Sequence, residues 1–366
     1  MSNSLVLYRK YRPKTFKEII GQDHIIKTLT GAISSNKVAH AYLFTGPRGI
    51  GKTTVARLLA KAVNCQNKKS SEPCNQCDFC QEANQGKSLD LIEIDAASNR
   101  GIDEIRELRE GIRFSPNRAK YKIFIIDEVH MLTMPAFNAL LKTLEEPPAH
   151  AIFILATTEA HKVPATILSR CQRFDFRRIS LVKIVERLSQ MAKSEKVEIE
   201  KPALDLIALN AEGSMRDAES LLGQIISLED KKITLAEVQG ILGTTDLGAV
   251  TKLVNYLSEK KVPQAFSFIN QQVEDGYDLI QLSKALVNYL RKILVVKVDA
   301  DLIKMVSHEL SQEQADQLLA LVKKFQLPDL LAMTKLFIRA ENEVKYASIP
   351  QLPLELAIIE SCQNKT

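Results

Sequence analysis

Residues 46–53 read Gly-Pro-Arg-Gly-Ile-Gly-Lys-Thr, a pattern whose positions have separate parts in holding phosphate. Glycine lets the backbone N–H groups of such a loop turn inward around phosphate oxygens. Lys52 would place a positive charge at the β- and γ-phosphates, and the Thr53 hydroxyl is a ligand for Mg²⁺. A plain glycine turn before a helix is the alternative. We expect ATP and Mg²⁺ to bind here, with the nucleotide held by Gly46, Pro47, Arg48, Gly49, Ile50, Gly51, Lys52, Thr53 and Thr54.

Two acidic residues further along the chain supply the other half of this chemistry. Residues 123–126 are Ile-Phe-Ile-Ile, which predicts a buried strand, and Asp127 and Glu128 follow at its carboxyl end. We expect Asp127 to hold Mg²⁺ together with Thr53, and Glu128 to activate the attacking water. A strand that ends in a solvated acidic turn is the alternative. Lys52 and these two acids are the catalytic residues expected within one phosphate site.

The elements that must position these groups form an alternating series along the chain. The apolar runs predict strands, and the segments between them predict helices, at 41–44, 54–61, 91–95, 103–113, 123–126, 135–144 and 151–156. Such alternation indicates an α/β fold, a parallel sheet with helices on both faces. The last strand ends in Thr157 and Thr158, polar groups placed where they could sense a γ-phosphate.

Four of the six cysteines fall close together, with the spacing Cys-x8-Cys-x2-Cys-x2-Cys. In a reducing compartment, such cysteines are typical ligands of a tetrahedral zinc ion, here Cys65, Cys74, Cys77 and Cys80. Four thiolates leave no open position, so the site would be structural. A disulfide pair and an iron–sulfur cluster are the alternatives. The polar insert 64–85 has little apolar surface, so a metal would stabilise it.

The composition is that of an ordinary globular protein. The chain has 366 residues, 45% hydrophobic and 25% charged, and its length predicts two or three domains. A net charge of +5 permits contact with nucleic acid without requiring it. No stretch approaches the ~20 apolar residues of a membrane span, and the first residues lack the apolar core of a signal peptide. We therefore expect a cytoplasmic protein with no membrane partner.

Three further segments complete the pattern of a known family. They are Leu-Ser-Arg-Cys at 168–171, Gly-Ser-Met-Arg-Asp at 213–217, and Tyr-Arg-Lys-Tyr-Arg-Pro-Lys-Thr-Phe at 8–16 followed by Ile20-Gly21-Gln22. With the phosphate loop, Asp127-Glu128-Val129-His130 and the cysteine quartet, they make the chain resemble the AAA+ clamp loaders. Within these it resembles the tau/gamma family of ATPase subunits of bacterial DNA polymerase III. The resemblance covers nearly the whole chain and is densest over 5–220.

The resemblance implies roles for more residues. Arg170 matches the family's arginine finger, a catalytic residue that points at the γ-phosphate bound by a neighbouring subunit; a surface arginine is the alternative. Arg216 matches the sensor-2 arginine of a helical lid, and Thr158 matches sensor 1, with Thr157 as a one-residue alternative. The segment Tyr8–Pro13 would border the adenine base. A DNA-facing role and a solvated patch are both open for the basic run of Arg9, Lys10, Arg12 and Lys14.

The family pattern also implies a domain plan and partners. An AAA+ ATP-binding domain would cover 1–179, with the zinc insert 64–85; a helical lid would cover 180–243, and a helical collar 244–366. Helical spacing of apolar residues after 180 agrees with this plan. The implied partners are delta, delta-prime and further copies of the chain in a five-subunit ring, together with a sliding clamp and primed DNA.

The expected function is therefore that of an ATPase motor subunit, which hydrolyses ATP jointly with a neighbour and loads a sliding clamp onto primed DNA during replication. A non-hydrolysing, delta-prime-like structural subunit is one alternative, although that relative typically has a degraded phosphate loop. Another AAA+ DNA motor, such as a branch-migration helicase, is a second, which the cysteine quartet disfavours. No further carboxylate constellation suggests a two-metal polymerase site in this chain.

Overall fold

The computed structural model describes residues 6–68, 70–99, 101, 110–228, 232–242, 247–306 and 312–363. Two compact units divide the chain between Thr234 and Leu235. The first unit contains a sheet of five parallel strands in the order β2-β3-β4-β1-β5. The strands are β1 (Ala41–Thr45), β2 (Leu91–Asp95), β3 (Lys122–Asp127), β4 (Ala151–Thr157) and β5 (Gln172–Asp175).

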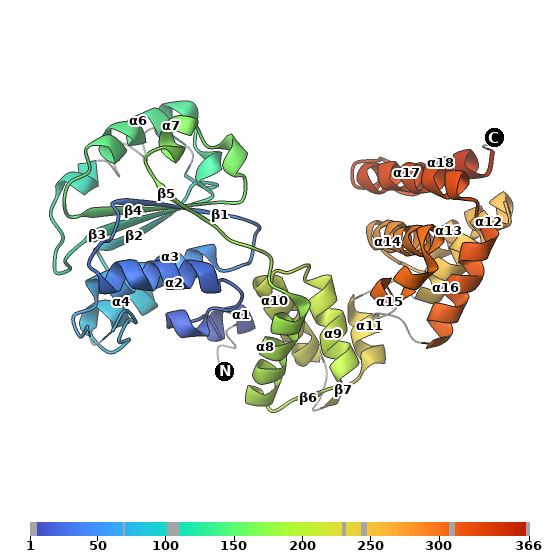
Figure 1. The fold of residues 1–366 in the computed structure, drawn as a ribbon, viewed down its shortest axis with the longest axis horizontal. Helices are drawn as coiled ribbons and strands as arrows, with labels where there is room; N and C mark the ends of the chain where they lie inside the picture. The colour runs from blue at the N-terminus through green and yellow to red at the C-terminus, as the bar shows by residue number, and fades with distance from the viewer. Residues whose placement is uncertain are drawn as a thin grey trace. The chain divides into compact units, whose positions relative to one another are not determined.

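Helices cover both faces of this sheet (Figure 1). Side chains alternate along each strand, so Ile123 and Ile125 pack with α2 and α3, whereas Phe124 and Ile126 pack with α6. Every residue of β1 and β4 is buried, as expected for central strands covered on both faces. The helices are α2 (Asp23–Ser34), α3 (Lys52–Asn64), α6 (Met134–Glu145) and the short α7 (Ala165–Leu168), with the one-turn helices η2 (Val129–Met131) and η3 (Ala160–Lys162) between them.

The predicted α/β architecture is confirmed, and most predicted elements occur close to their expected bounds. The predicted helix 103–113 lies largely outside the described residues; its end, 110–113, is helical. Strand β5 was not predicted from the sequence. Its residues are polar except for Phe174, and it pairs only with β1 at the edge of the sheet.

The remainder of the first unit is a small helical bundle, which contacts the N-terminal segment. Its helices are α8 (Leu181–Ser194), α9 (Lys201–Asn210) and α10 (Met215–Leu228), joined by a two-stranded parallel pairing of β6 (Glu198–Ile199) with β7 (Lys232–Ile233). Helix α1 (Leu7–Lys10) packs on α10, where Leu7 lies over Gly223. The turn η1 (Phe16–Glu18) follows α1, and helix α4 (Asp78–Gln85) lies in the cysteine insert.

The described elements of the second unit are all helices. Its core is mainly aliphatic, with Leu253, Leu286, Leu290 and Ile358 fully buried, and it includes the aromatic Phe337, which is almost fully buried. The helices are α11 (Leu235–Leu242), α12 (Leu247–Ser258), α13 (Val262–Glu274), α14 (Leu279–Val298), η4 (Ala300–Leu302), α15 (Ile303–Val306), α16 (Gln312–Lys324), α17 (Leu327–Val344) and α18 (Leu352–Gln363). Helix α11 belongs to this unit, whereas the sequence placed 235–243 with the lid; the three-domain division stays a prediction. In the described part of the chain, no helix is long and apolar enough to cross a membrane.

Candidate nucleotide site and cysteine cluster

The loop 46–53 turns tightly between β1 and α3. Gly46, Gly49 and Gly51 have φ angles of 138°, 76° and 102°, values that residues other than glycine rarely adopt. A Cβ atom at Gly46 would lie 2.5 Å from the carbonyl oxygen of Phe176, so this position also lacks room for a side chain. Gly51 directly precedes the first turn of α3, which therefore points its free N–H groups and positive dipole end at the loop.

Lys52 stands inside this loop with its ammonium largely buried. Its Nζ donates hydrogen bonds of 2.7 Å to the carbonyl oxygens of Gly46 and Pro47. Burial lowers the pKa of Lys52, while the carboxylates of Glu128 and Asp127 act in the opposite direction. A buried cation that is hydrogen-bonded to carbonyl groups is well placed to receive phosphate oxygens.

The two predicted magnesium ligands are brought together. Thr53 Oγ1 donates to Asp127 Oδ2 over 2.6 Å, which joins the start of α3 to the carboxyl end of β3. The contact between Thr53 and Asp127 agrees with the general rule that ligand sites in parallel sheets form beyond the carboxyl ends of the strands. A hydroxyl and a carboxylate in contact form a donor set that suits Mg²⁺.

Glu128 contacts Thr158, the residue that directly follows β4. It adopts a left-handed backbone conformation with φ 46°, and its Oε2 accepts from Thr158 Oγ1 at 2.9 Å and from Thr158 N at 3.2 Å. Thr157 is fully buried instead, and its hydroxyl lies 3.0 Å from His130 Nδ1. His130 in turn lies between the carboxylates of Glu128 and Glu159, at 3.3 Å and 3.1 Å. Thr158 is therefore the threonine whose hydroxyl meets the predicted water-activating residue.

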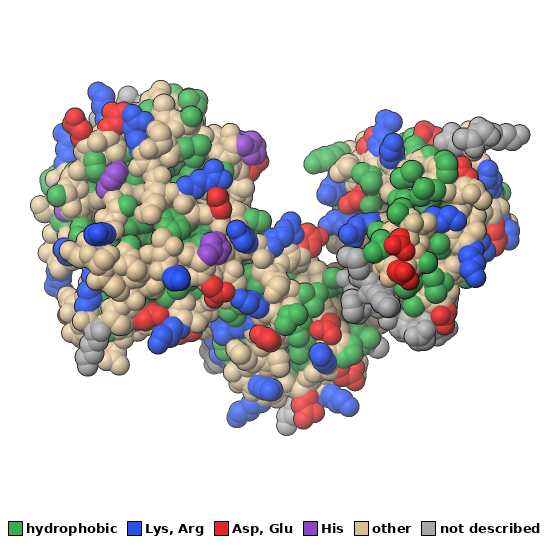
Figure 2. Space-filling model, in the orientation of Figure 1, with side chains coloured by type: hydrophobic (Ala, Val, Ile, Leu, Met, Phe, Trp, Pro, Cys, Tyr) green, Lys and Arg blue, Asp and Glu red, His purple; other side chains and the backbone are tan. Residues whose placement is uncertain are grey.

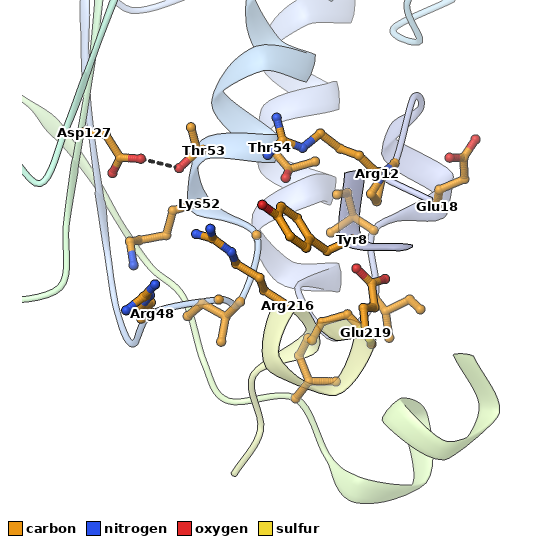
Figure 3. A pocket seen from close by; sticks show the side chains of 18 of the residues that line it. Tyr8, Arg12, Glu18, Arg48, Lys52, Thr53, Thr54, Asp127, Arg216 and Glu219 are labelled. Carbon is orange, nitrogen blue, oxygen red and sulfur yellow. Dashed lines mark hydrogen bonds between the residues drawn. The ribbon is translucent and has the colours of Figure 1, made fainter. Parts of the chain in front are cut away.

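The lid docks directly on the phosphate loop. Arg216 N donates to the carbonyl oxygen of Gly49 at 3.1 Å, and Ser214 Oγ accepts from Asp217 N at 3.3 Å, so Ser214 caps the start of helix α10. Figure 3 shows Arg216 extending from the lid toward Tyr8 and the loop, with its guanidinium 4.9 Å from the centre of the Tyr8 ring. Both predicted elements, the loop and the lid arginine, thus meet at one place.

A cavity of about 430 Å³ lies between the loop, the N-terminal segment and the lid, which is a size typical of small-ligand sites. Of the predicted nucleotide-binding residues, Thr158, Gly46 and Pro47 do not line it. The residues that do line it include Tyr8, Arg12, Pro13, Glu18, Ile19, Ile20, Arg48, Gly49, Ile50, Gly51, Lys52, Thr53, Thr54, Asp127, Glu128, Arg187, Arg216 and Glu219.

Replacing Gly49 by alanine is expected to weaken ATP binding roughly tenfold. The new Cβ atom would lie 1.9 Å from Ser214 Oγ, so the loop and the lid helix must separate, and φ at this position is 76°. Equilibrium titration with ATP measures the effect. Gly31→Ala in helix α2 is the matched control, because its Cβ atom would meet nothing within 4 Å. Equal affinity of both variants would contradict the contact between loop and lid.

An acidic residue that the sequence analysis missed lies in this cavity. Glu219 on α10 is 6% exposed, and burial raises the pKa of its carboxyl to about 7, against the opposing effects of Arg187 and Arg12. The nearest Arg187 nitrogen is 3.9 Å from Glu219 Oε1. Arg187 also donates to the carbonyl oxygen of Tyr11 at 2.9 Å. No motif marks this cluster, because its members come from three separate segments.

Glu219→Gln is expected to flatten the dependence of stability on pH. The folded chain holds a proton on Glu219 that the unfolded chain has released between about pH 4.5 and pH 7, so stability falls as pH rises through this window. The buried Glu219 carboxyl should therefore lower the free energy of unfolding by on the order of 2 to 3 kcal/mol at pH 8 relative to pH 5. Urea unfolding followed by circular dichroism at both pH values measures the difference. The exposed Glu186→Gln on α8 should behave like the unmodified chain, and an unchanged pH slope for Glu219→Gln would refute the assignment.

Arg170 lies apart from the cavity that the described residues form. Its guanidinium donates to Glu145 Oε1 at 2.5 Å, to the carbonyl oxygen of Thr166 at 2.7 Å and to Ser169 Oγ at 3.2 Å. The side chain is about one-third exposed. Arg170 is therefore not brought together with the other predicted catalytic residues within one chain.

The basic run near the N-terminus is partly engaged within the chain. Lys10 pairs with Glu195 of the lid at 2.7 Å, and the Tyr11 hydroxyl donates to the same carboxylate. Arg12 lines the cavity, and its guanidinium has a pKa lowered by burial. Two of the four cations therefore serve contacts with the lid and the cavity.

The four predicted metal ligands converge. The Sγ atoms of Cys65, Cys74, Cys77 and Cys80 all lie within 4.8 Å of one another, and none of the four forms a disulfide. Gln76 N and Cys77 N donate to Cys74 Sγ at 3.4 Å and 3.2 Å. Burial opposes ionisation of Cys74, yet these bonds lower its pKa to about 6. Four converging sulfurs with N–H groups directed at one of them fit a tetrahedral metal ion bound by thiolates.

Three families of known proteins match successive parts of the chain. Residues 21–180 match the DNA polymerase III delta subunit family, and 183–230 match the ATPase lid domain of DNA polymerase III clamp loader subunits. Residues 233–365 match domain III of DNA polymerase III subunits gamma and tau. Together these matches extend along almost the whole chain.

Curated relatives agree with these matches. DNA polymerase III subunit tau of Bacillus subtilis is 43% identical over 98% of this chain, and that of Escherichia coli is 42% identical over 80%. DNA polymerase III subunit gamma of Buchnera aphidicola is 35% identical over 98% of both chains. The chain spans 63% and 46% of the two tau subunits.

Solved structures give a weaker likeness. The Holliday junction branch migration motor RuvB of Thermotoga maritima has a TM-score of 0.48 and is 20% identical, over 67% of this chain and 78% of that chain. A similarity of this size carries no argument about fold or function.

Proposed function

Because the chain belongs to the DNA polymerase III gamma and tau subunit family, we propose that it is the ATPase motor subunit of a clamp loader. In this proposal it binds and hydrolyses ATP to open a sliding clamp and load it onto primed DNA during replication. The observation that carries the proposal is the assembled phosphate site, in which Lys52, Thr53 and Asp127 all line one cavity together with residues of the lid, and Thr53 is bonded to Asp127.

We assign each residue of the site a step in hydrolysis. The loop and Lys52 would bind the β- and γ-phosphates, and Thr53 and Asp127 would hold Mg²⁺, which would neutralise phosphate charge. Glu128 orients and deprotonates the attacking water. The Thr158 hydroxyl, just beyond the end of β4, donates a hydrogen bond to Glu128. We therefore propose Thr158 as the sensor of the γ-phosphate. Arg216 reaches the phosphates from the lid.

Hydrolysis is shared between subunits in this proposal. Arg170 lies with Glu145 and away from the chain's own cavity, so it can reach a γ-phosphate only in a neighbouring subunit. A guanidinium there would stabilise the charge that develops on the transferred phosphate. No polymerase step is assigned to this chain.

We propose that the second unit serves as the collar of a five-subunit ring with delta, delta-prime and further copies of this chain. Figure 2 shows apolar side chains gathered on this unit over α17 and α18. The exposed apolar residues there are Leu327, Leu331, Ile338, Leu352 and Leu356. Exposed apolar groups on neighbouring helices are typical of surfaces that other chains cover. We propose zinc as the ion of the cysteine cluster, and a cytoplasmic location, where a bacterial chromosome is replicated.

The test is ATP turnover of the chain reconstituted with the other loader subunits, with and without clamp and primed DNA. We expect clamp and DNA together to stimulate turnover strongly. Absence of stimulation with a competent clamp would refute the loader function. Metal analysis of the purified chain should find about one zinc per chain; iron in place of zinc would favour the cluster alternative.

The alternatives differ in testable ways. A delta-prime-like structural subunit would not need the intact loop or the Thr53–Asp127 contact, and it would show no turnover of its own. Another AAA+ DNA motor would turn over ATP with DNA alone and would gain nothing from the clamp.

A further inference from the structure

The cavity wall that the N-terminal segment forms is interrupted by residues that face elsewhere. Arg12 and Pro13 line the cavity before the interruption, and Glu18, Ile19 and Ile20 line it afterwards. We call these five residues the N-terminal wall. The intervening residues 14–17 are absent from the cavity lining, so the position of the wall depends on what holds this short connection.

A side chain of the cysteine insert binds the main chain of residues 14–17. The carboxylate of Glu72 accepts hydrogen bonds from Phe16 N at 2.7 Å and from Lys17 N at 3.1 Å. Two N–H groups on one ionised carboxylate form a charge-assisted pair, stronger than neutral hydrogen bonds. Phe16 is 1% exposed, so its backbone position is also fixed by the core.

A buried lysine joins the insert, the connection and the helix of the phosphate loop. Lys61 on α3 is 3% exposed, and burial lowers the pKa of its ammonium. Its Nζ donates to Asn75 Oδ1 and Asn84 Oδ1, both at 2.8 Å, and to the carbonyl oxygen of Lys14 at 3.2 Å. An ammonium without water requires all three acceptors, so the three segments are held together.

One of these acceptors stands among the metal ligands. Asn75 lies between Cys74 and Cys77 in a left-handed conformation with φ 57°. Its Nδ2 donates to the same carbonyl oxygen of Lys14, at 3.0 Å. The geometry of the cysteine turn therefore sets where Asn75 meets both Lys61 and Lys14.

We propose that the metal-loaded cysteine insert positions the N-terminal wall of the nucleotide cavity, with Glu72 and Lys61 as the positioning residues. None of the insert residues lines the cavity, so the effect passes through residues 14–17. The inference rests on the proposed zinc and nucleotide binding, and it adds that the occupancy of one site sets the affinity of the other.

The first experiment uses the zinc-loaded chain and the same chain stripped of zinc by a chelator. Hydrogen exchange of the peptide covering 14–20 should become faster after stripping, while the strand 151–157 exchanges as before. The affinity for ATP should fall roughly tenfold. A stripped chain with unchanged exchange at 14–20 and unchanged ATP affinity would overturn the proposal. Failure of the zinc-loaded chain to bind ATP would instead refute the proposed function.

The second experiment uses substitutions that leave the cysteines intact. Glu72→Ala should keep its zinc, yet it should raise both the exchange at 14–20 and the KM for ATP several-fold, with kcat in the assembled loader nearly unchanged. Glu72→Gln keeps one acceptor oxygen and should restore part of the affinity. Glu82→Ala on the same insert is the matched control, because the one ion pair of its side chain with a described residue is to Arg118, at 3.9 Å.

Lys61→Met tests the other joint with a side chain of similar length and no charge. It should also retain zinc and weaken ATP binding. Since Glu72→Ala leaves the buried lysine in place, the proposal remains testable if Lys61→Met does not fold. Equal KM values for Glu72→Ala and Glu82→Ala at full zinc content would refute the role of Glu72.

Discussion

Arg170→Ala is expected to reduce the clamp- and DNA-stimulated ATP turnover of the assembled loader by about a thousandfold or more, while ATP binding stays intact. Arginine fingers in comparable phosphoryl-transfer sites contribute 10³ to 10⁵ in rate. The physical reason is that Arg170 contacts Glu145 and Thr166 and not the cavity of its own chain. In the proposed shared site, its charge would act on the transition state in a neighbouring subunit and not on the affinity of its own loop.

The measurement is steady-state phosphate release from loaders in which every copy of the chain carries the substitution. ATP binding is titrated separately on the isolated chain. Arg173→Ala is the control: this arginine is half exposed, pairs with Asp175 at 2.8 Å and should leave turnover unchanged. Normal stimulated turnover with Arg170→Ala would contradict the shared site.

Lys52→Ala is expected to abolish ATP binding at concentrations that saturate the unmodified chain. Loss of charge-assisted bonds to phosphate, on the order of 3 kcal/mol, weakens binding at least a hundredfold. The nucleotide-free chain should unfold at the same temperature as before or at a higher one, because burial of the Lys52 ammonium is costly, as its lowered pKa indicates.

Equilibrium titration and thermal unfolding together separate these two effects. Lys162→Ala serves as the control, since this lysine is exposed and pairs only locally with Glu159 at 2.8 Å. A fall in melting temperature for Lys52→Ala would mean that the lysine supports the empty loop rather than the ligand. Retained ATP affinity would contradict the assignment of the loop.

Much of the site could be predicted because short motifs carry it. The loop and Asp127 belong to contiguous patterns that follow apolar strands, and a parallel sheet brings the carboxyl ends of these strands to one edge. The cysteines were recognised by spacing alone, and their sulfurs meet.

The remainder depended on contacts between segments that are distant in the chain. Strand β5 contains a single apolar residue, Phe174, so no apolar run predicts it. Its pairing with β1 identifies it as a strand. In the sequence, nothing distinguishes Glu219 from other helix residues. Its burial and its proximity to Arg12 and Arg187 arise from the fold. The partners of Thr157 and Thr158 also depended on the fold, since the Thr158 hydroxyl contacts Glu128 whereas the Thr157 hydroxyl contacts His130.

The bond between the lid and the phosphate loop joins two backbones, Arg216 N to Gly49 O. Every residue except proline carries that N–H group, so truncating the arginine side chain removes the cation and leaves this joint in place. Alanine substitution of Arg216 therefore cannot measure this backbone bond, and it would report only what the arginine charge contributes to nucleotide binding. An amide-to-ester replacement at residue 216, made by chemical ligation, would remove the N–H donor and keep the arginine side chain, so it would measure the contribution of the backbone bond.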